Sequence, residues 1–278
     1  MFTVNVSLAS TAEYSSKAAE SIKDLNPNAA DLLITSVITS MVTDLGVVAP
    51  TASGLLTYYD GDNNSTHSVD GYFVAPKKFD GNDHEEHRIS MTYGGHVETC
   101  KGANTFAVPG IYKILNLIFE RYASLPLEKL LEFPIKTAKD GFKLTQPTKD
   151  YFIHSLEPMF MWHEQSKIAL ANVHNDLENG IVKLDKLGDT LSHMSDEGFN
   201  DFYIGDISKS IVETLKIEGG HATKDDFNGY ELIEENKFEY QYKNLKLTGH
   251  SGPSIGGLMV LKYLNALSVE SKNIEETL

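Results

Sequence analysis

One helix-length segment constrains the fold of this chain more than any other, because it is apolar around most of its circumference. The segment spans residues 29 to 45 and reads AADLLITSVITSMVTDL. Its apolar residues include Leu32, Leu33, Val37, Ile38, Met41, Val42 and Leu45. A helix with so many apolar sides is buried between layers of other elements. The 278 residues, 41% of them apolar, can supply such a core as one large domain or part of one.

The other segments alternate between helical and strand-like patterns, which predicts a mixed α and β fold. Ser10 and Glu13 have capping-box spacing and predict a helix with Ala18, Ile22 and Leu25 on its inner stripe. Strands are expected at 55–59, 71–74, 238–242 and 245–247, with a polar turn at 60–65. Helices are expected at 111–122, at 127–139, over most of 147–215, and at 258–267.

Charge and cysteine content limit the classes of partner. The net charge is -15 and the isoelectric point is near 5.0, which disfavours nucleic acid and anionic membrane surfaces as main ligands. Cys100 is the only cysteine, and no signal-peptide or membrane-spanning pattern is recognised, so a cytoplasmic location is expected. Gly219-Gly220 does not fit a dinucleotide or phosphate-loop motif, and no cofactor is expected.

Three local patterns invite catalytic or metal hypotheses. Ser254 lies in Gly252-x-Ser-x-Gly256, but neither histidine nor aspartate follows it, so a structural turn is favoured over a nucleophile elbow. His84 and His87 are three residues apart without a further marked ligand, and no metal site is expected. His163 is expected to be a packing histidine rather than a base.

Several longer stretches agree with one family. The stretch from Glu197 to Tyr230 reads EGFNDFYIGDISKSIVETLKIEGGHATKDDFNGY. It contains Phe202-Tyr203 and Gly205, then the glycine pair, and then Thr223, Asp226 and Tyr230. The glycine pair should end one helix, and Thr223 should cap the next. The agreement extends over most of the chain. It includes the stretches NPNAADLLITSVITSMVTDLGVVAPTASG, FAVPGIYKILNLIFERYASLPLEKLLEFPIKTAKDGF and GPSIGG.

In these motifs the chain resembles the large subunit of the γ-glutamyltransferase (γ-glutamyl transpeptidase) family. The resemblance implies an α+β fold, the large-subunit portion of the four-layer αββα sandwich of N-terminal nucleophile hydrolases. It implies that residues 1–278 form a single large-subunit domain, completed by a separate small subunit from the same precursor. A threonine at the start of that small subunit would attack a γ-glutamyl or related small amide, so no catalytic residue is expected in this chain. A dimer of such heterodimers is a further expectation.

Two positions depart from the family pattern. Where the family has an arginine that binds the substrate α-carboxylate, this chain has Tyr72, within Asp70-Gly71-Tyr72-Phe73-Val74. Tyrosine cannot form a bidentate ion pair with a carboxylate. Tyr72 is the one candidate substrate-binding residue, by hydrogen bonding or stacking, and a packed strand aromatic is the alternative. The family's glycine run after Ser-Gly is also missing, since Ser53-Gly54 leads directly into Leu55.

Three functional hypotheses follow. The first is the large subunit of a γ-glutamyltransferase-like amidohydrolase or acyltransferase that is active only with its small subunit. The second is a noncatalytic relative that acts as a binding or assembly protein. The third is a serine hydrolase that uses Ser254.

Overall fold

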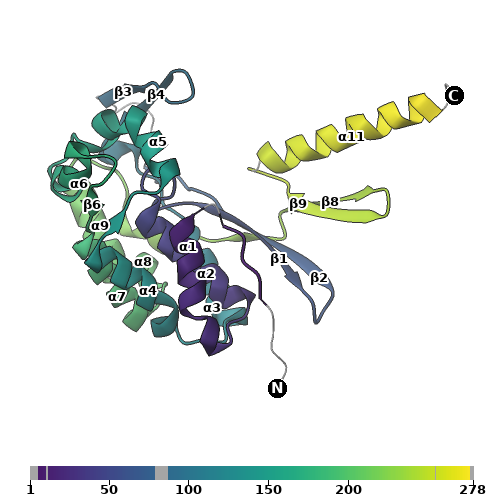
Figure 1. The fold of residues 1–278 in the computed structure, drawn as a ribbon, viewed down its shortest axis with the longest axis horizontal. Coiled ribbons are helices and arrows are strands. Elements are labelled where there is room, and N and C mark those ends of the chain that lie inside the picture. Colours follow the sequence, from purple (N-terminus) through teal and green to yellow (C-terminus); the bar gives the residue numbers. More distant parts are fainter. Residues whose placement is uncertain (1–5, 11, 79–86, 254, 276–278) are drawn as a thin grey trace.

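The apolar helix, α2 (Ala29–Thr43), is enclosed by other helices, as its sequence predicts (Figure 1). The computed structural model describes residues 6–10, 12–78, 87–253 and 255–275. Within α2, Ile34, Ile38 and Met41 are almost completely buried. Helices α1, α3 and α4 pack around it. The described helices around α2 form the helical body, and this body contains most of the core.

The helical body is built mainly from segments of 9 to 15 residues. Its longer helices are α1 (Glu13–Ser21), α2, α3 (Ile111–Tyr122), α4 (Leu127–Asp140), α5 (Gln146–Ser155), α6 (Glu164–Asn175), α7 (Asp185–Glu197) and α9 (Asp206–Ile217). The shorter ones are α8 (Asp201–Ile204) and α10 (Lys224–Asn228), and a π-helical turn, Leu156–Phe160, follows α5. The predicted helix 111–122 coincides with α3, and the predicted helix 127–139 is confirmed with one more residue.

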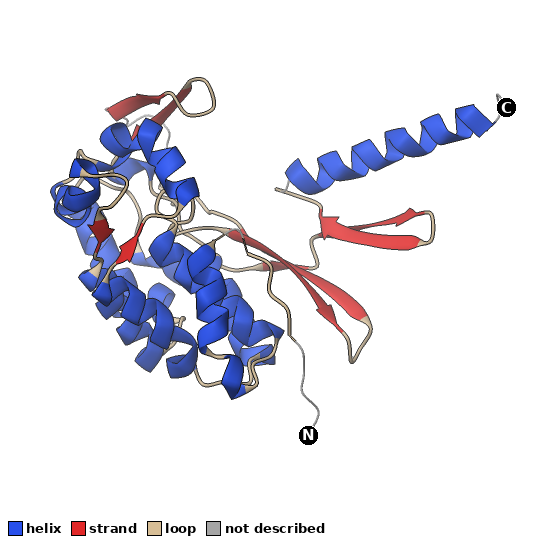
Figure 2. Cartoon of the chain, in the orientation of Figure 1, coloured by secondary structure: helices blue, strands red, loops and turns tan. Residues whose placement is uncertain are grey.

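The strands form small antiparallel sheets, shown in red in Figure 2. The largest has the order β1-β2-β7, from β1 (Gly54–Asp60), β2 (Ser65–Gly71) and β7 (Ile233–Glu234). The register pairs Gly54 with Gly71 and Asp60 with Ser65. Two further two-stranded sheets are the hairpin of β3 (His87–Met91) and β4 (Val97–Lys101), and the pair of two-residue strands β5 (Phe142–Lys143) and β6 (Ile181–Val182).

The last described elements extend away from the helical body. They are the hairpin of β8 (Lys237–Tyr242) and β9 (Leu245–His250), followed by α11 (Ile255–Glu275). From the body outward, Figure 1 shows β1 and β2, then this hairpin, then α11. The order is helix, strand, strand, helix, as in the expected αββα fold. Among the described helices, none is both long enough and apolar enough to span a bilayer.

The second strand differs from its prediction. The structure places β2 at Ser65–Gly71, whereas the sequence predicted a strand at 71–74. Beyond Gly71, only an isolated bridge between Val74 and Val108 remains. Residues 65–70 are polar except for Val69 and have no apolar alternation, but all of them pair with β1. Pairing with a neighbouring strand therefore decided the conformation here, rather than local pattern.

The start of the first helix also differs. Ala12 occupies the N-cap of α1, and the Ser10 hydroxyl accepts a hydrogen bond from the Ala12 amide at 3.2 Å. The predicted capping box of Ser10 and Glu13 is therefore wrong. Ala18 and Ile22 are buried as expected, but Leu25 is exposed because the helix ends before it, at Ser21.

Asp31 connects the start of α2 to the segment between α3 and α4. It is fully buried and forms a capping box with Asn28, whose amide donates to Asp31 Oδ2 at 2.8 Å. Asp31 Oδ1 accepts hydrogen bonds from the amides of Ser124 and Leu125 at 3.0 and 3.1 Å, and Oδ2 accepts one from the Ser124 hydroxyl. One carboxylate thus satisfies donors from two segments that are more than 90 residues apart.

Replacement of Asp31 should therefore destabilise the chain. Asp31→Asn places an amide N–H₂ among buried donors, and we expect a loss of about 3 kcal/mol in the free energy of unfolding. Asp24→Asn is the matched control, since Asp24 is exposed, and should change stability by less than about 0.5 kcal/mol. Urea denaturation of both variants measures the difference. Equal stabilities would show that the Asp31 hydrogen bonds contribute nothing net.

Candidate substrate-binding loop

The segment that follows β2 is the candidate site, because it exposes three consecutive apolar side chains. The side chains of Tyr72, Phe73 and Val74 are 48%, 43% and 50% exposed. The rings of Tyr72 and Phe73 meet edge to face, with their centroids 5.7 Å apart. Residues 72–77 are called the 72–77 loop below. Tyr72 thus lies just beyond the end of β2, at Gly71, and is half-exposed in this chain.

The start of the loop is fixed by a carboxylate and a tyrosine. Asp70 is buried, and its Oδ1 accepts a hydrogen bond from the Tyr72 amide at 2.9 Å. The hydroxyl of Tyr230 donates to the Tyr72 carbonyl at 2.6 Å. Burial, and then the charge of Asp70, raise the pKa of Tyr230 to about 12, so its hydroxyl stays protonated at neutral pH and remains a donor.

The end of the loop is fixed by Asp226. Its Oδ1 accepts a hydrogen bond from the Lys77 amide at 2.9 Å, and its Oδ2 accepts bonds from the amide and hydroxyl of Thr223 at 2.8 and 2.6 Å. Burial acts to raise the pKa of Asp226, but these hydrogen bonds hold it below its ordinary value. Asp226 is therefore ionised at neutral pH. The side chains of Thr223, Asp226 and Tyr230 are called the clamp below.

The middle of the loop pairs with the segment before α3. Val74 and Val108 exchange two backbone hydrogen bonds, at 3.1 and 2.8 Å. Gly110 makes this approach possible, because a Cβ there would lie 2.0 Å from the Tyr230 hydroxyl and 2.2 Å from the Gly71 carbonyl oxygen. Any larger residue at position 110 would push the loop away from α3.

A second tyrosine supports the clamp from behind. The Tyr203 hydroxyl donates to the Pro109 carbonyl at 2.8 Å and accepts from the Lys113 amide at 3.2 Å. Its ring stacks on that of Tyr230, with centroids 5.7 Å apart. Lys113 lies above the Tyr203 ring, with Nζ 4.8 Å from the centroid, and donates to Asn200 Oδ1 at 2.8 Å. Burial lowers the pKa of Lys113.

The sequence prediction for Thr223 is confirmed, but its role was incomplete. Thr223 and Asp226 form a capping box at the start of α10. Gly219 has φ of +82°, and the Gly220 amide donates to the Leu215 carbonyl at 2.7 Å, so the glycine pair ends α9 as predicted. No pattern in the sequence indicated that the same cap holds the 72–77 loop. The available signal was that three separate motifs, around Asp70, Pro109 and Asp226, all resemble one family.

The candidate residues other than Tyr72 that the structure describes take no part in this site. His163 was predicted to be a satisfied packing histidine rather than a base; its side chain is 39% exposed, pairs with Glu218 at 3.3 Å and meets the Trp162 ring edge to face, so it is satisfied but only half-buried. Ser254 and His84 lie outside the described residues, and His87 begins β3. Across the described residues, no group of three or more His, Cys, Asp or Glu side chains could hold a metal ion.

Comparisons with known proteins identify the family of this chain. The family model for gamma-glutamyltranspeptidase matches residues 15–277. The chain belongs to the gamma-glutamyltranspeptidase family. The resemblance read from the sequence is thereby confirmed, and so is the fold class, α+β with the N-terminal nucleophile hydrolase architecture.

Curated relatives are much longer than this chain. A glutathione hydrolase proenzyme of Escherichia coli is 24% identical over 212 residues, which are 74% of this chain and 35% of the relative. One from Arthroderma benhamiae is 28% identical over 172 residues, or 60% of this chain and 30% of the relative. The chain therefore spans about a third of the length of these curated relatives.

Solved structures agree in fold. The gamma-glutamyltranspeptidase of Helicobacter pylori matches with a TM-score of 0.79 at 21% identity, over 95% of this chain and 75% of that chain. The enzyme of Pseudomonas nitroreducens, complexed with L-DON, matches with a TM-score of 0.75 at 23% identity, over 92% of this chain and 73% of that chain. At these identities the likeness shows the fold.

The clamp can be tested by removal of one hydroxyl. Tyr230→Phe deletes the hydrogen bond to the Tyr72 carbonyl, and we expect hydrogen exchange at the Val74 amide to accelerate about fivefold, from the loss of about 1 kcal/mol. Amides of α4 serve as the internal reference. Tyr263→Phe is the control, since the Tyr263 side chain is 65% exposed on α11. Unchanged exchange at Val74 in Tyr230→Phe would show that the clamp does not hold the loop.

Proposed function

We propose that this chain is the large subunit of a γ-glutamyltransferase-like amidohydrolase or acyltransferase, active only with a small subunit that supplies an N-terminal threonine. The family membership supports this reaction class. Several relatives are named glutathione hydrolase proenzymes, which supports a γ-glutamyl amide, or a related small amide, as the substrate. The threonine would attack the amide carbonyl and form an acyl-enzyme, which water or an amine then resolves.

The uncovered surface of α11 is the observation that supports the two-chain proposal most strongly. Ile255, Met259, Val260 and Tyr263 are 59–73% exposed along this helix. Among the described elements, α11 packs mainly on β9, and the β8–β9 hairpin is a two-stranded sheet. A two-stranded hairpin is marginal by itself in water, and most helical stability in proteins comes from packing of an apolar face. A second polypeptide that covers α11 and adds strands to the hairpin would bury the exposed apolar side chains and stabilise the two-stranded sheet.

The share of each relative that this chain covers also supports the two-chain proposal. The chain covers about three quarters of two solved chains but only about a third of the curated proenzymes. This difference is expected if the solved chains are large subunits separated from their precursors. The cytoplasmic location and the dimer of heterodimers remain predictions.

Mass analysis of the purified material tests the proposal. We expect intact mass and N-terminal sequencing to find a second polypeptide that begins with threonine and copurifies with this chain. Met259→Glu should abolish copurification, because a charge in a buried apolar interface is costly. Ile217→Glu is the matched control, since Ile217 is 86% exposed at the end of α9. A single species of 278 residues without amidase activity would instead favour the noncatalytic binding protein.

We also propose that Tyr72 contacts the acyl donor. Its exposed ring is held in place by the hydrogen bonds to its own amide and carbonyl, so it can offer a fixed surface to a substrate. The resemblance aligns Tyr72 with an arginine that binds the α-carboxylate of a glutamyl group. Without that guanidinium, the site should discriminate weakly between donors with and without an α-carboxylate.

Donor selectivity therefore tests Tyr72. Tyr72→Arg should raise the kcat/KM ratio of γ-glutamyl-p-nitroanilide over 4-aminobutyryl-p-nitroanilide by about tenfold, since the second donor lacks the α-carboxylate. Tyr59→Arg is the control, because Tyr59 is also exposed but lies at the far end of β1. An unchanged ratio in Tyr72→Arg would mean that Tyr72 lies away from the α-carboxylate position.

A further inference from the structure

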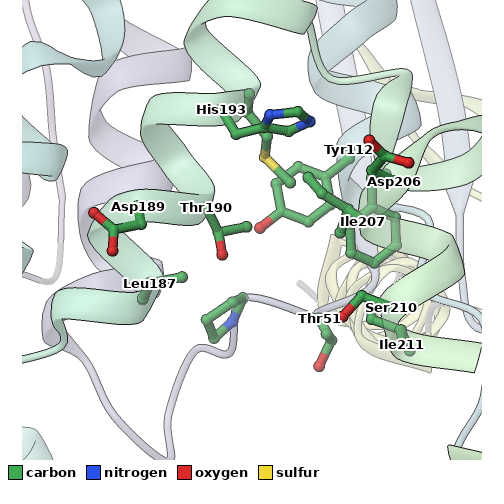
Figure 3. Close-up of a pocket in the computed structure, with 13 residues that line it drawn as sticks. Thr51, Tyr112, Leu187, Asp189, Thr190, His193, Asp206, Ile207, Ser210 and Ile211 are labelled. Carbon is green, nitrogen blue, oxygen red and sulfur yellow. The ribbon is translucent and has the colours of Figure 1, made fainter. Parts of the chain in front are cut away.

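A cavity of about 560 Å³ lies in the helical body, between α7, α9 and the loop at Pro50–Thr51 (Figure 3). Its volume is in the range of small-molecule sites. Its wall is mostly apolar, with Leu187, Met194, Phe202 and Ile211 among the lining residues. The 72–77 loop and the clamp contribute no residue to this lining. The cavity is therefore distinct from the candidate substrate-binding loop.

The side chain of Tyr112 lies at the floor of the cavity. The side chain of Tyr112 is 2% exposed, and Figure 3 shows its hydroxyl pointing into the cavity. Within the described part of the chain, this hydroxyl makes no hydrogen bond. Its ring packs against Phe202, with centroids 4.6 Å apart. The hydroxyl oxygen is not among the buried polar atoms that lack a partner, so it is open to the cavity, where a polar ligand group can bond to it in place of water.

The rim of the cavity is acidic. Asp189 and Asp206 lie on opposite sides of the opening in Figure 3. Asp189 is paired with Lys139 at 2.7 Å, and the carboxylate of Asp201, behind the wall, is paired with His193 at 3.1 Å. Asp206 has no ion-pair partner among the described residues, so its charge is available to a ligand.

We propose that this cavity binds a small organic cation with an apolar body. The ammonium group lies at the rim beside Asp206, the body fills the apolar wall, and a polar group at the other end bonds to the Tyr112 hydroxyl. This inference goes beyond the proposed function and does not depend on it. The net charge of -15 further favours a cation over an anion.

Two probes that differ by one hydroxyl test the floor. Binding of tyramine and phenethylamine to the full chain, with any polypeptide that copurifies, is measured by calorimetry or ligand-observed NMR. We expect tyramine to bind about fivefold more tightly than phenethylamine, and Tyr112→Phe to abolish this difference. Tyr112→Phe should leave the thermal stability of the ligand-free chain unchanged, because the hydroxyl makes no hydrogen bond within the described part of the chain and is open to the cavity. A tyramine advantage that persists in Tyr112→Phe would place the binding elsewhere.

Charge variants test the rim. Asp206→Asn should weaken the binding of both amines about two- to fivefold, which is typical of an exposed ion pair. Asp196→Asn is the matched control, since Asp196 is exposed on α7 and does not line the cavity. The anion 3-(4-hydroxyphenyl)propionate should bind more weakly than tyramine. Equal binding of anion and cation, full affinity in Asp206→Asn, or no saturable binding of tyramine would each overturn the proposal.

Discussion

The close contact of Gly71, Gly110 and Tyr230 is the constraint on which the candidate site depends. It joins the end of β2, the start of α3 and the segment after α10, and a Cβ at position 110 would lie 2.0 Å from the Tyr230 hydroxyl. Because the backbones at Gly71 and Gly110 meet the Tyr230 side chain there, the Tyr72 carbonyl comes within hydrogen-bond reach of the Tyr230 hydroxyl. The exposed aromatic side chains of the 72–77 loop are then presented by a rigid support, although they lie outside regular secondary structure.

One residue of the clamp, Asp226, holds both the cap of α10 and the end of the 72–77 loop. Asp226 completes the capping box of α10 with one carboxylate oxygen and holds the Lys77 amide with the other. The ionised carboxylate makes both sets of hydrogen bonds stronger than neutral ones. Local structure at residues 223–226 and the position of a loop 150 residues earlier are therefore governed by the same side chain.

Sequence alone predicted the elements whose pattern is local. The apolar patterns of residues 111–122 and 127–139 predicted the bounds of α3 and α4 to within one residue. The family motifs predicted the fold class. β2 was misplaced because its residues are polar and become a strand only through pairing with β1. The clamp contacts were not predictable from spacing, since Asp226 and Lys77 are 149 residues apart. Tyr72 was selected from the sequence, but its exposure was visible only in the structure.

The apolar face of α11 has a consequence for the lifetime of the free chain. A long helix with Met259, Val260 and Tyr263 facing water offers a surface on which identical chains can associate. This association is second order in protein concentration, whereas unfolding of the helical body is first order. At high expression the yield of free chain is therefore governed by the rate of collision between exposed helices, and not by the free energy of unfolding of the core.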